Sequence, residues 1–174
     1  KEILSFSGWV GYGAVAYVGR NQGAAILVNM FFNTVMNTAL GIANSINSIV
    51  GMISRTITQP IEPQLIKSYT AGEVKRSYDL LILSTKLTYL LVLVASAPFF
   101  IECDWILSLW LGQVPPFATM FTVLIIIDTL IDSLNSGVKS IIFASGKIKL
   151  FQIIPSTIKL CAIFIAYFVL KSGN

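Results

Sequence analysis

Residues 74–101 read VKRSYDLLILSTKLTYLLVLVASAPFFI, and from Leu80 onward this stretch carries a single charge, Lys86. A helix needs about 20 apolar residues to cross the hydrocarbon core of a bilayer, and the backbone groups there must be hydrogen-bonded within the segment. The stretch therefore predicts a transmembrane helix. Four further apolar segments of comparable length predict the rest of an all-α, polytopic membrane helix bundle of about five transmembrane helices in one domain (1–174); they cover residues 5–32, 35–69, 117–145 and 148–170.

The composition favours the same class. Of the 174 residues, 55% are hydrophobic and only 11% are charged, and the mean hydropathy is +0.79. A soluble domain carries roughly 25% charged residues, so a soluble surface would be short of charge. The net charge of +4 lies mostly in the predicted connectors, so we expect no nucleic-acid partner.

The residue types that most often carry catalysis or bind metal are scarce. The chain contains no histidine, which removes the commonest general base and metal ligand. Cys103 and Cys161 are far apart and form no zinc pattern. The longest predicted connector, 102–116, offers only Glu102 and Asp104 as acidic groups. We therefore expect no enzyme, no metal site and no cofactor beyond a possible coupling proton or sodium ion.

Charge in the connectors predicts the orientation of the bundle. Cytoplasmic connectors of membrane proteins carry an excess of lysine and arginine. One side of the predicted bundle is basic and the other carries Glu102, Asp104 and only Lys171, so we expect the N-terminus in the cytoplasm and the C-terminus outside. The basic side holds Lys1, Lys67, Lys75, Arg76, Lys147 and Lys149.

Prolines and glycines predict where the helices bend and end. Pro60 and Pro63 each lack a backbone donor and clash with the preceding turn, so we expect a kink in the second helix. Gly72 is a suitable C-terminal stop for that helix.

The second predicted helix has a polar stripe along its length. Polar and small residues recur there at intervals of three and four, which places them on one face of a helix, with an isoleucine-rich stripe behind them. The candidate substrate-binding residues on this stripe are Asn37, Asn44, Ser48 and Arg55. Asn and Ser are also favoured where membrane helices pack together, at about 0.6 kcal/mol per contact, so simple helix–helix contact is the alternative for the three uncharged residues.

Arg20 and Arg55 lie deep inside apolar segments. A charge near the bilayer centre costs at least about 2.5–3.5 kcal/mol, so such residues usually face a polar cavity or a partner. Two guanidinium groups facing one cavity would suit a phosphate group, which arginine binds in bidentate fashion. The alternative is that one or both pair with Asp128 or Asp132.

The fourth predicted helix carries Asp128 and Asp132 on the same face as Lys139. Carboxylates inside a membrane are typical of sites that bind a coupling proton or sodium ion. Internal ion pairs with Lys139, Lys159 or an arginine explain them equally well, and both interpretations stay open at this point.

Several stretches, taken in order and spacing, resemble one family over nearly the whole chain. They are RNQG (20–23), LVNMFF (27–32), GIA (41–43) with IN (46–47), PQLIKSY (63–69) with GE (72–73), LWLG (109–112) with VP (114–115), and GKIK (146–149). The set is similar to the bacterial polysaccharide (O-antigen type) flippases, in the multidrug/oligosaccharidyl-lipid/polysaccharide exporter superfamily. One residue departs from the pattern: Glu62 precedes Pro63 where a neutral residue is expected.

The resemblance implies a fold and a function. Such proteins have two bundles of six helices around a central cavity, and this chain resembles the first five helices of the second bundle. Its partners would then include membrane lipids and the missing first bundle and last helix of the same protein. The family moves undecaprenyl-pyrophosphate-linked oligosaccharide across the bacterial inner membrane by alternating access, with Arg20 and Arg55 as the matching pyrophosphate-binding residues. A cation-coupled multidrug antiporter of the same superfamily, centred on Asp128 and Asp132, is the alternative.

Overall fold

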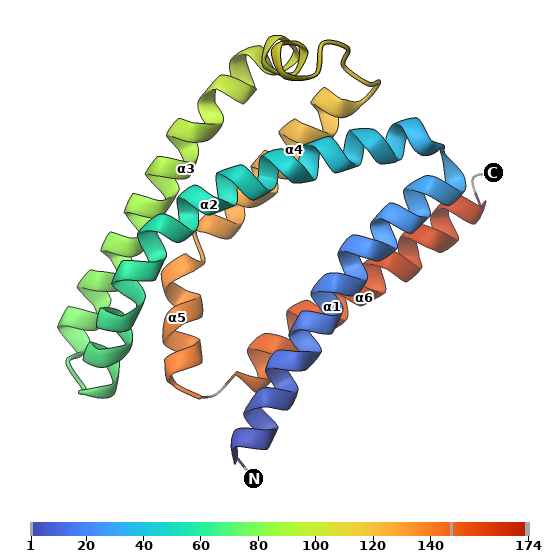
Figure 1. The fold of residues 1–174 in the computed structure, drawn as a ribbon. Coiled ribbons are helices and arrows are strands. Elements are labelled where there is room, and N and C mark those ends of the chain that lie inside the picture. The colour runs from blue at the N-terminus through green and yellow to red at the C-terminus, as the bar shows by residue number, and fades with distance from the viewer. Residues whose placement is uncertain (1, 147, 173–174) are drawn as a thin grey trace. The chain divides into compact units, whose positions relative to one another are not determined.

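The computed structural model describes residues 2–146 and 148–172, and the regular structure in these ranges is helical (Figure 1). The all-α prediction is therefore confirmed. The helices are α1 (Glu2–Phe31), α2 (Thr34–Thr70), α3 (Val74–Leu111), α4 (Ala118–Ser133), α5 (Ser136–Ala144) and α6 (Lys149–Ser172).

Length and composition mark the chain as a membrane protein. Within the described residues, α3 and α6 are each long and apolar enough to cross a bilayer. Helices α4 and α5 are long and apolar enough to cross a bilayer when they are taken together, although the chain bends by 48° between them. The described chain thus has two candidate membrane-spanning helices, or three if the bent pair forms a single span.

Part of the predicted connector 102–116 is helical, and one predicted helix is interrupted. The predicted end of the third helix at Ile101 coincides with a break at Glu102, which is non-helical (φ −137°, ψ 48°), but the segment that follows is helical up to Leu111. Residues 103–111 are mostly apolar and form further helical turns, because they can bury Cys103 and Leu107. The predicted helix 117–145 is likewise interrupted between Ser133 and Ser136.

The chain divides into two compact units. The first unit contains α1 and α6. The second contains α3, α4, α5 and the part of α2 from Thr38 onward.

In the first unit, α1 and α6 pack side by side and run parallel. Gly19 lies near Leu160, and Gly23, one turn later, lies near Ile163, so residue numbers increase in the same direction along both helices. A Cβ atom added at Gly23 would lie only 3.0 Å from Ile163 Cδ1. Glycine at this interface therefore lets the helices approach closely, as small residues do in other membrane proteins.

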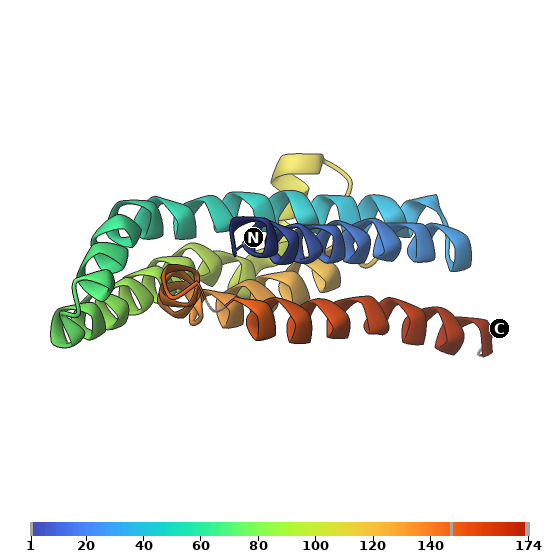
Figure 2. The same ribbon diagram turned by 90° about the horizontal axis from the view of Figure 1, so that it is seen from below.

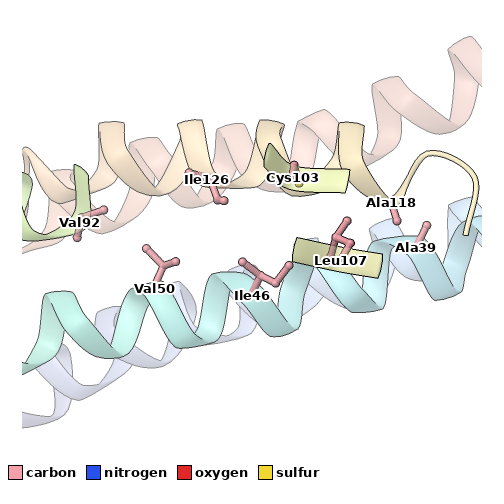
Figure 3. Packing of buried hydrophobic residues seen from close by; sticks show 8 residues of the cluster. All are labelled: Ala39, Ile46, Val50, Val92, Cys103, Leu107, Ala118 and Ile126. Atoms are coloured by element: carbon pink, nitrogen blue, oxygen red, sulfur yellow. The ribbon is translucent and has the colours of Figure 1, made fainter. Parts of the chain in front are cut away.

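In the second unit, α3 packs antiparallel to α4 and α5. Asp104 accepts a hydrogen bond from the Thr119 hydroxyl near one end of this interface, and Gly137 meets the Leu81 carbonyl near the other. Helix α2 adds its apolar face to the same core. The core cluster comprises Ala39, Ile46 and Val50 of α2, Val92, Cys103 and Leu107 of α3, and Ala118 and Ile126 of α4 (Figure 3).

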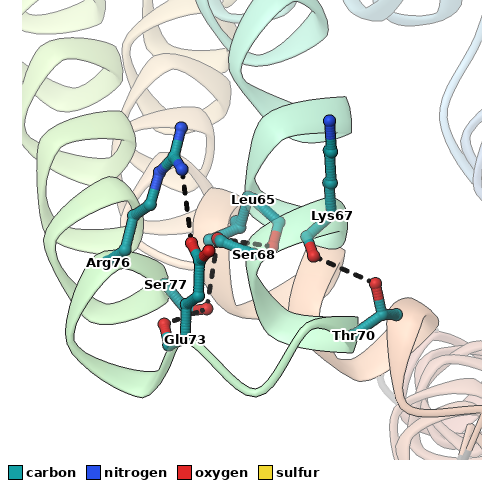
Figure 4. Close-up of polar contacts among 7 residues, drawn as sticks. All are labelled: Leu65, Lys67, Ser68, Thr70, Glu73, Arg76 and Ser77. Atoms are coloured by element: carbon teal, nitrogen blue, oxygen red, sulfur yellow. Dashed lines mark hydrogen bonds and ion pairs between the residues drawn. The ribbon is translucent and has the colours of Figure 1, made fainter.

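A tight turn joins α2 to α3. Gly72 has φ +75°, a conformation that glycine adopts without strain, and the Glu73 amide donates to the Ser68 carbonyl over 3.0 Å. The Ser77 hydroxyl donates to Ser68 Oγ over 3.2 Å, and Arg76 pairs with Glu73 (Figure 4). The prediction that the second helix stops at Gly72 is confirmed.

The two ends of α2 also follow from local chemistry. Asn33 Oδ1 accepts a hydrogen bond from the Met36 amide over 2.9 Å, which is a helix N-cap interaction. Toward its C-terminus the helix contains Pro60 and Pro63, and Figure 2 shows it bending in that part.

We predict that Gly137→Ala lowers stability while Gly41→Ala does not. A Cβ atom at Gly137 would lie 3.0 Å from the Leu81 carbonyl oxygen and 3.1 Å from Thr85 Oγ1. Overpacking of this kind costs about 1–3 kcal/mol. Nothing lies within 4 Å of a Cβ at Gly41, so alanine there should stabilise α2 by about 0.5–1 kcal/mol.

The measurement is the apparent Tm of each purified variant in detergent. Equal Tm values for the two variants would show that α5 does not pack closely against the α3 backbone at Gly137.

Candidate functional site

Helix α2 has a buried face and a polar face on opposite sides. Ala39, Ala43, Ile46 and Val50 are buried along one face. The residues of the predicted polar stripe fall on the other: Asn44, Ser48 and Arg55 are exposed and Asn37 is half-buried. The predicted isoleucine-rich stripe behind the polar face included Ile46, Ile49 and Val50. Ile46 and Val50 are buried, whereas Ile49 is 58% exposed, so the prediction was wrong for Ile49.

Arg55 is the basic residue of this polar face, and Glu62 lies two helical turns further along it. No carboxylate lies within ion-pair distance of Arg55 among the residues that the structure describes. Its predicted pairing with Asp128 or Asp132 is therefore not found. An arginine that is exposed, unpaired and set on a polar helix face is free to bind an anion.

The uncharged residues of the polar face differ in their hydrogen bonding. The Ser48 hydroxyl donates to the carbonyl of Asn44 over 3.0 Å, so its donor is already used within the helix. The Asn44 side chain is exposed and makes no hydrogen bond within the described ranges. Helix–helix contact therefore does not account for Asn44.

The polar contact between α2 and α4 involves Asn47, which lay outside the predicted stripe. Thr129 Oγ1 lies 2.5 Å from Asn47 Oδ1 and 2.9 Å from the Ile125 carbonyl oxygen. The only signal in the sequence was the position of Asn47 directly after the apolar Ile46, at the edge of the buried face. This hydrogen bond joins α2 to α4 at the edge of the buried face of α2 and does not involve the polar face.

Arg20 lies on α1, in the first unit, and is exposed. The nearby Gly23 faces α6, so the small residues around Arg20 serve close helix packing. Lys159 of α6 lies over the ring of Tyr17, 6.0 Å from its centroid, which is a cation–π contact. Because Arg20 and Arg55 belong to different units, their joint action on one ligand stays a prediction.

Asp132 forms an ion pair across the break between α4 and α5. Lys139 Nζ lies 2.6 Å from Asp132 Oδ1 and 2.7 Å from Oδ2. Asp132 is in the last turn of α4 and Lys139 in the first turns of α5, where each charge opposes the dipole of its own helix. The pair offsets both costs, so Asp132 is engaged in an internal ion pair, as one of the two sequence interpretations proposed.

Asp128 is exposed on α4, one turn before Asp132. A metal ion would need more acidic or soft ligands than the described residues gather. Among them, no group of three or more His, Cys, Asp or Glu side chains is placed to hold one.

Comparison with known proteins found no relative. No family model matches the sequence, and searches of curated proteins and of solved structures gave no match either.

We predict that the Asp132–Lys139 pair behaves as a unit. Helices α4 and α5 together form a candidate span, and a charge left alone near the centre of a bilayer costs at least about 2.5–3.5 kcal/mol. Asp132→Ala or Lys139→Ala should each lower the apparent Tm and the amount of inserted protein, and the double variant should recover most of the loss.

The matched control is the Glu73–Arg76 pair, whose side chains are exposed at the α2–α3 turn. Removing either partner there should change stability by less than about 1 kcal/mol. Additive losses in the Asp132→Ala/Lys139→Ala double variant would contradict a coupled pair.

Proposed function

We propose that this chain is part of an integral membrane transporter that flips a lipid-linked oligosaccharide, carried on undecaprenyl pyrophosphate, across the bacterial cytoplasmic membrane. The observation that carries the proposal is Arg55, an exposed cation on the polar face of α2 that has no ion-pair partner among the described residues. The resemblance of the sequence to polysaccharide flippases supplies the substrate class. Transport would proceed by alternating access in a complete two-bundle protein.

The polar face offers groups for both parts of such a substrate. The guanidinium of Arg55 would bind the pyrophosphate through paired hydrogen bonds, as arginine does with phosphate groups. Asn44, whose side chain makes no hydrogen bond to the described residues, would offer its amide donor and its acceptor to sugar hydroxyls, whereas Ser48 offers mainly its acceptor lone pairs. Asn37 lies two turns earlier on the same face, and Arg20 would supply the second cation.

The topology we propose has five crossings. Helices α1 and α6 are parallel within the first unit, so if both cross the membrane, the chain between them crosses it an odd number of times. Helix α3 is one candidate span, the tight turn at Gly72 sends α2 the opposite way, and α4 with α5 runs antiparallel to α3. Three crossings between α1 and α6 satisfy this requirement.

A cation-coupled antiporter is the less favoured function. It would use free carboxylates to bind its cationic substrate or coupling ion, and the charge of Asp132 is already balanced by Lys139. Asp128 would then have to carry that role largely by itself, whereas Arg55 would repel a cation.

We predict that Arg55→Ala reduces polysaccharide export more strongly than Arg55→Lys. A hydrogen-bonded charge contributes about 1.5–3 kcal/mol, so its loss should weaken pyrophosphate binding by about tenfold or more. Lysine keeps the charge but not the bidentate geometry. The measurement is surface polysaccharide in cells whose own copy of the gene is deleted, normalised to the amount of protein in the membrane.

Arg76→Ala is the matched control, because Arg76 is also exposed but lies at the α2–α3 turn. It should leave export unchanged. If Arg20→Ala and Arg55→Ala both export normally, the two arginines do not bind the substrate.

We also predict the orientation of the turns. The basic residues beside Gly72 and Gly146 favour the cytoplasm. Alkaline phosphatase, which folds only outside the cytoplasm, should be inactive when fused at either glycine and active when fused at Gly112. Activity at Gly72 would overturn the proposed orientation without affecting the count of crossings.

A further inference from the structure

The last part of α3, residues Cys103–Leu111, is set apart from the rest of the helix. The non-helical conformation of Glu102 interrupts α3 just before it, and Pro98 lies one turn earlier. Figure 1 shows this part nearly end-on at the top of α3, and Figure 2 shows it turned out of the line of the helix. It ends at Gly112, whose φ is +72° and whose amide donates to the Ser108 carbonyl over 2.8 Å. We call residues 103–111 the terminal segment.

The terminal segment has one buried and one exposed apolar face. Cys103 and Leu107 are buried in the core of the second unit, one helical turn apart. Trp105 and Leu109 are also one turn apart and are 62% and 73% exposed. A short helix with this arrangement is anchored to the protein on one side and presents large apolar side chains on the other.

Three features indicate that this face meets lipid at the level of the headgroups. Exposed apolar residues follow one another along α3 from Val94 and Ile101 to Trp105, so the terminal segment adjoins the exposed apolar residues of a candidate span. Glu102 and the exposed Asp104 lie beside it, and charges of this kind are costly in hydrocarbon. Tryptophan is enriched at the membrane–water boundary.

We propose that the terminal segment is an interfacial helix that lies in the plane of the membrane and places Trp105 and Leu109 between the lipid headgroups and the upper acyl chains. Helices that lie on a membrane in this way bury one apolar face at that depth. The segment fixes where α3 leaves the bilayer, at Ile101–Glu102, and holds the α3–α4 end of the second unit at a constant depth. The inference rests on membrane insertion and is independent of the transported substrate.

The test uses tryptophan fluorescence, because the printed sequence contains only three tryptophans. Every tryptophan except Trp105 is replaced by phenylalanine, and the protein is reconstituted into vesicles of phosphatidylcholine and phosphatidylglycerol. The lipids carry bromine, which quenches fluorescence on contact, either near the headgroup or near the end of the acyl chain. We expect Trp105 to lose more fluorescence with bromine near the headgroup.

The matched control is Val94→Trp in a protein that has no other tryptophan. Val94 is 67% exposed on the same helix, inside the candidate span, so it should be quenched more by bromine near the chain end. Leu109→Trp in the same background repeats the measurement at a second position of the face and should behave like Trp105.

Three results would overturn the proposal. Stronger quenching of Trp105 by deep bromine would mean that the segment spans the membrane. Quenching by iodide in water, but not by lipid, would mean that it is an aqueous connector. Quenching by neither would mean that another protein surface covers Trp105.

Discussion

Close approach of helix backbones at small residues is the interaction on which both units depend. Apolar side chains gain little by leaving lipid for each other, so membrane helices associate through dense packing. In the first unit, Gly23 admits Ile163 of the parallel helix, and in the second, Gly137 lies against the Leu81 carbonyl. An added Cβ atom would lie 3.0 Å from the neighbouring atom in each case, where the Ile163 side chain can shift but the Leu81 carbonyl belongs to the backbone. The positions of the larger apolar residues follow from these contacts.

The features predicted correctly from the sequence are those that depend on a residue's own conformation or on helical periodicity. The stop at Gly72 requires positive φ, and the burial of Ile46 and Val50 follows from helical periodicity. The sequence did not predict the terminal segment, because Glu102 and Asp104 suggested a polar connector. Nor did it predict the break after Ser133, where no proline or glycine precedes the bend. The break is flanked by the contact of Gly137 with α3 and bridged by the Asp132–Lys139 pair, and a linear pattern contains neither.

The candidate site was predicted unevenly for a related reason. The polar face of α2 is a periodic feature, so Asn44 and Arg55 could be placed on it from spacing alone. The role of Asn47 depends on which helix lies opposite, and Thr129 is 82 residues further along the chain. Asp132 had two possible roles until its distance to Lys139 was known. Sequence patterns thus identify polar faces, whereas partners across an interface require the fold.

Helices α1 and α2 are not among the candidate spans, and their polar residues bear on the proposed function. Both α1 and α2 are long enough to cross a bilayer, but they are less apolar than the candidate spans α3 and α6. Arg20 lies on α1 and Arg55 lies on α2. A helix with a charged, polar face is stable in a membrane only when that face meets water or polar protein groups. If α2 crosses, its polar face must line such a space, because the opposite face is already occupied by Val92 and Ile126. In the two-bundle transporter that we propose, Arg55 would face that space.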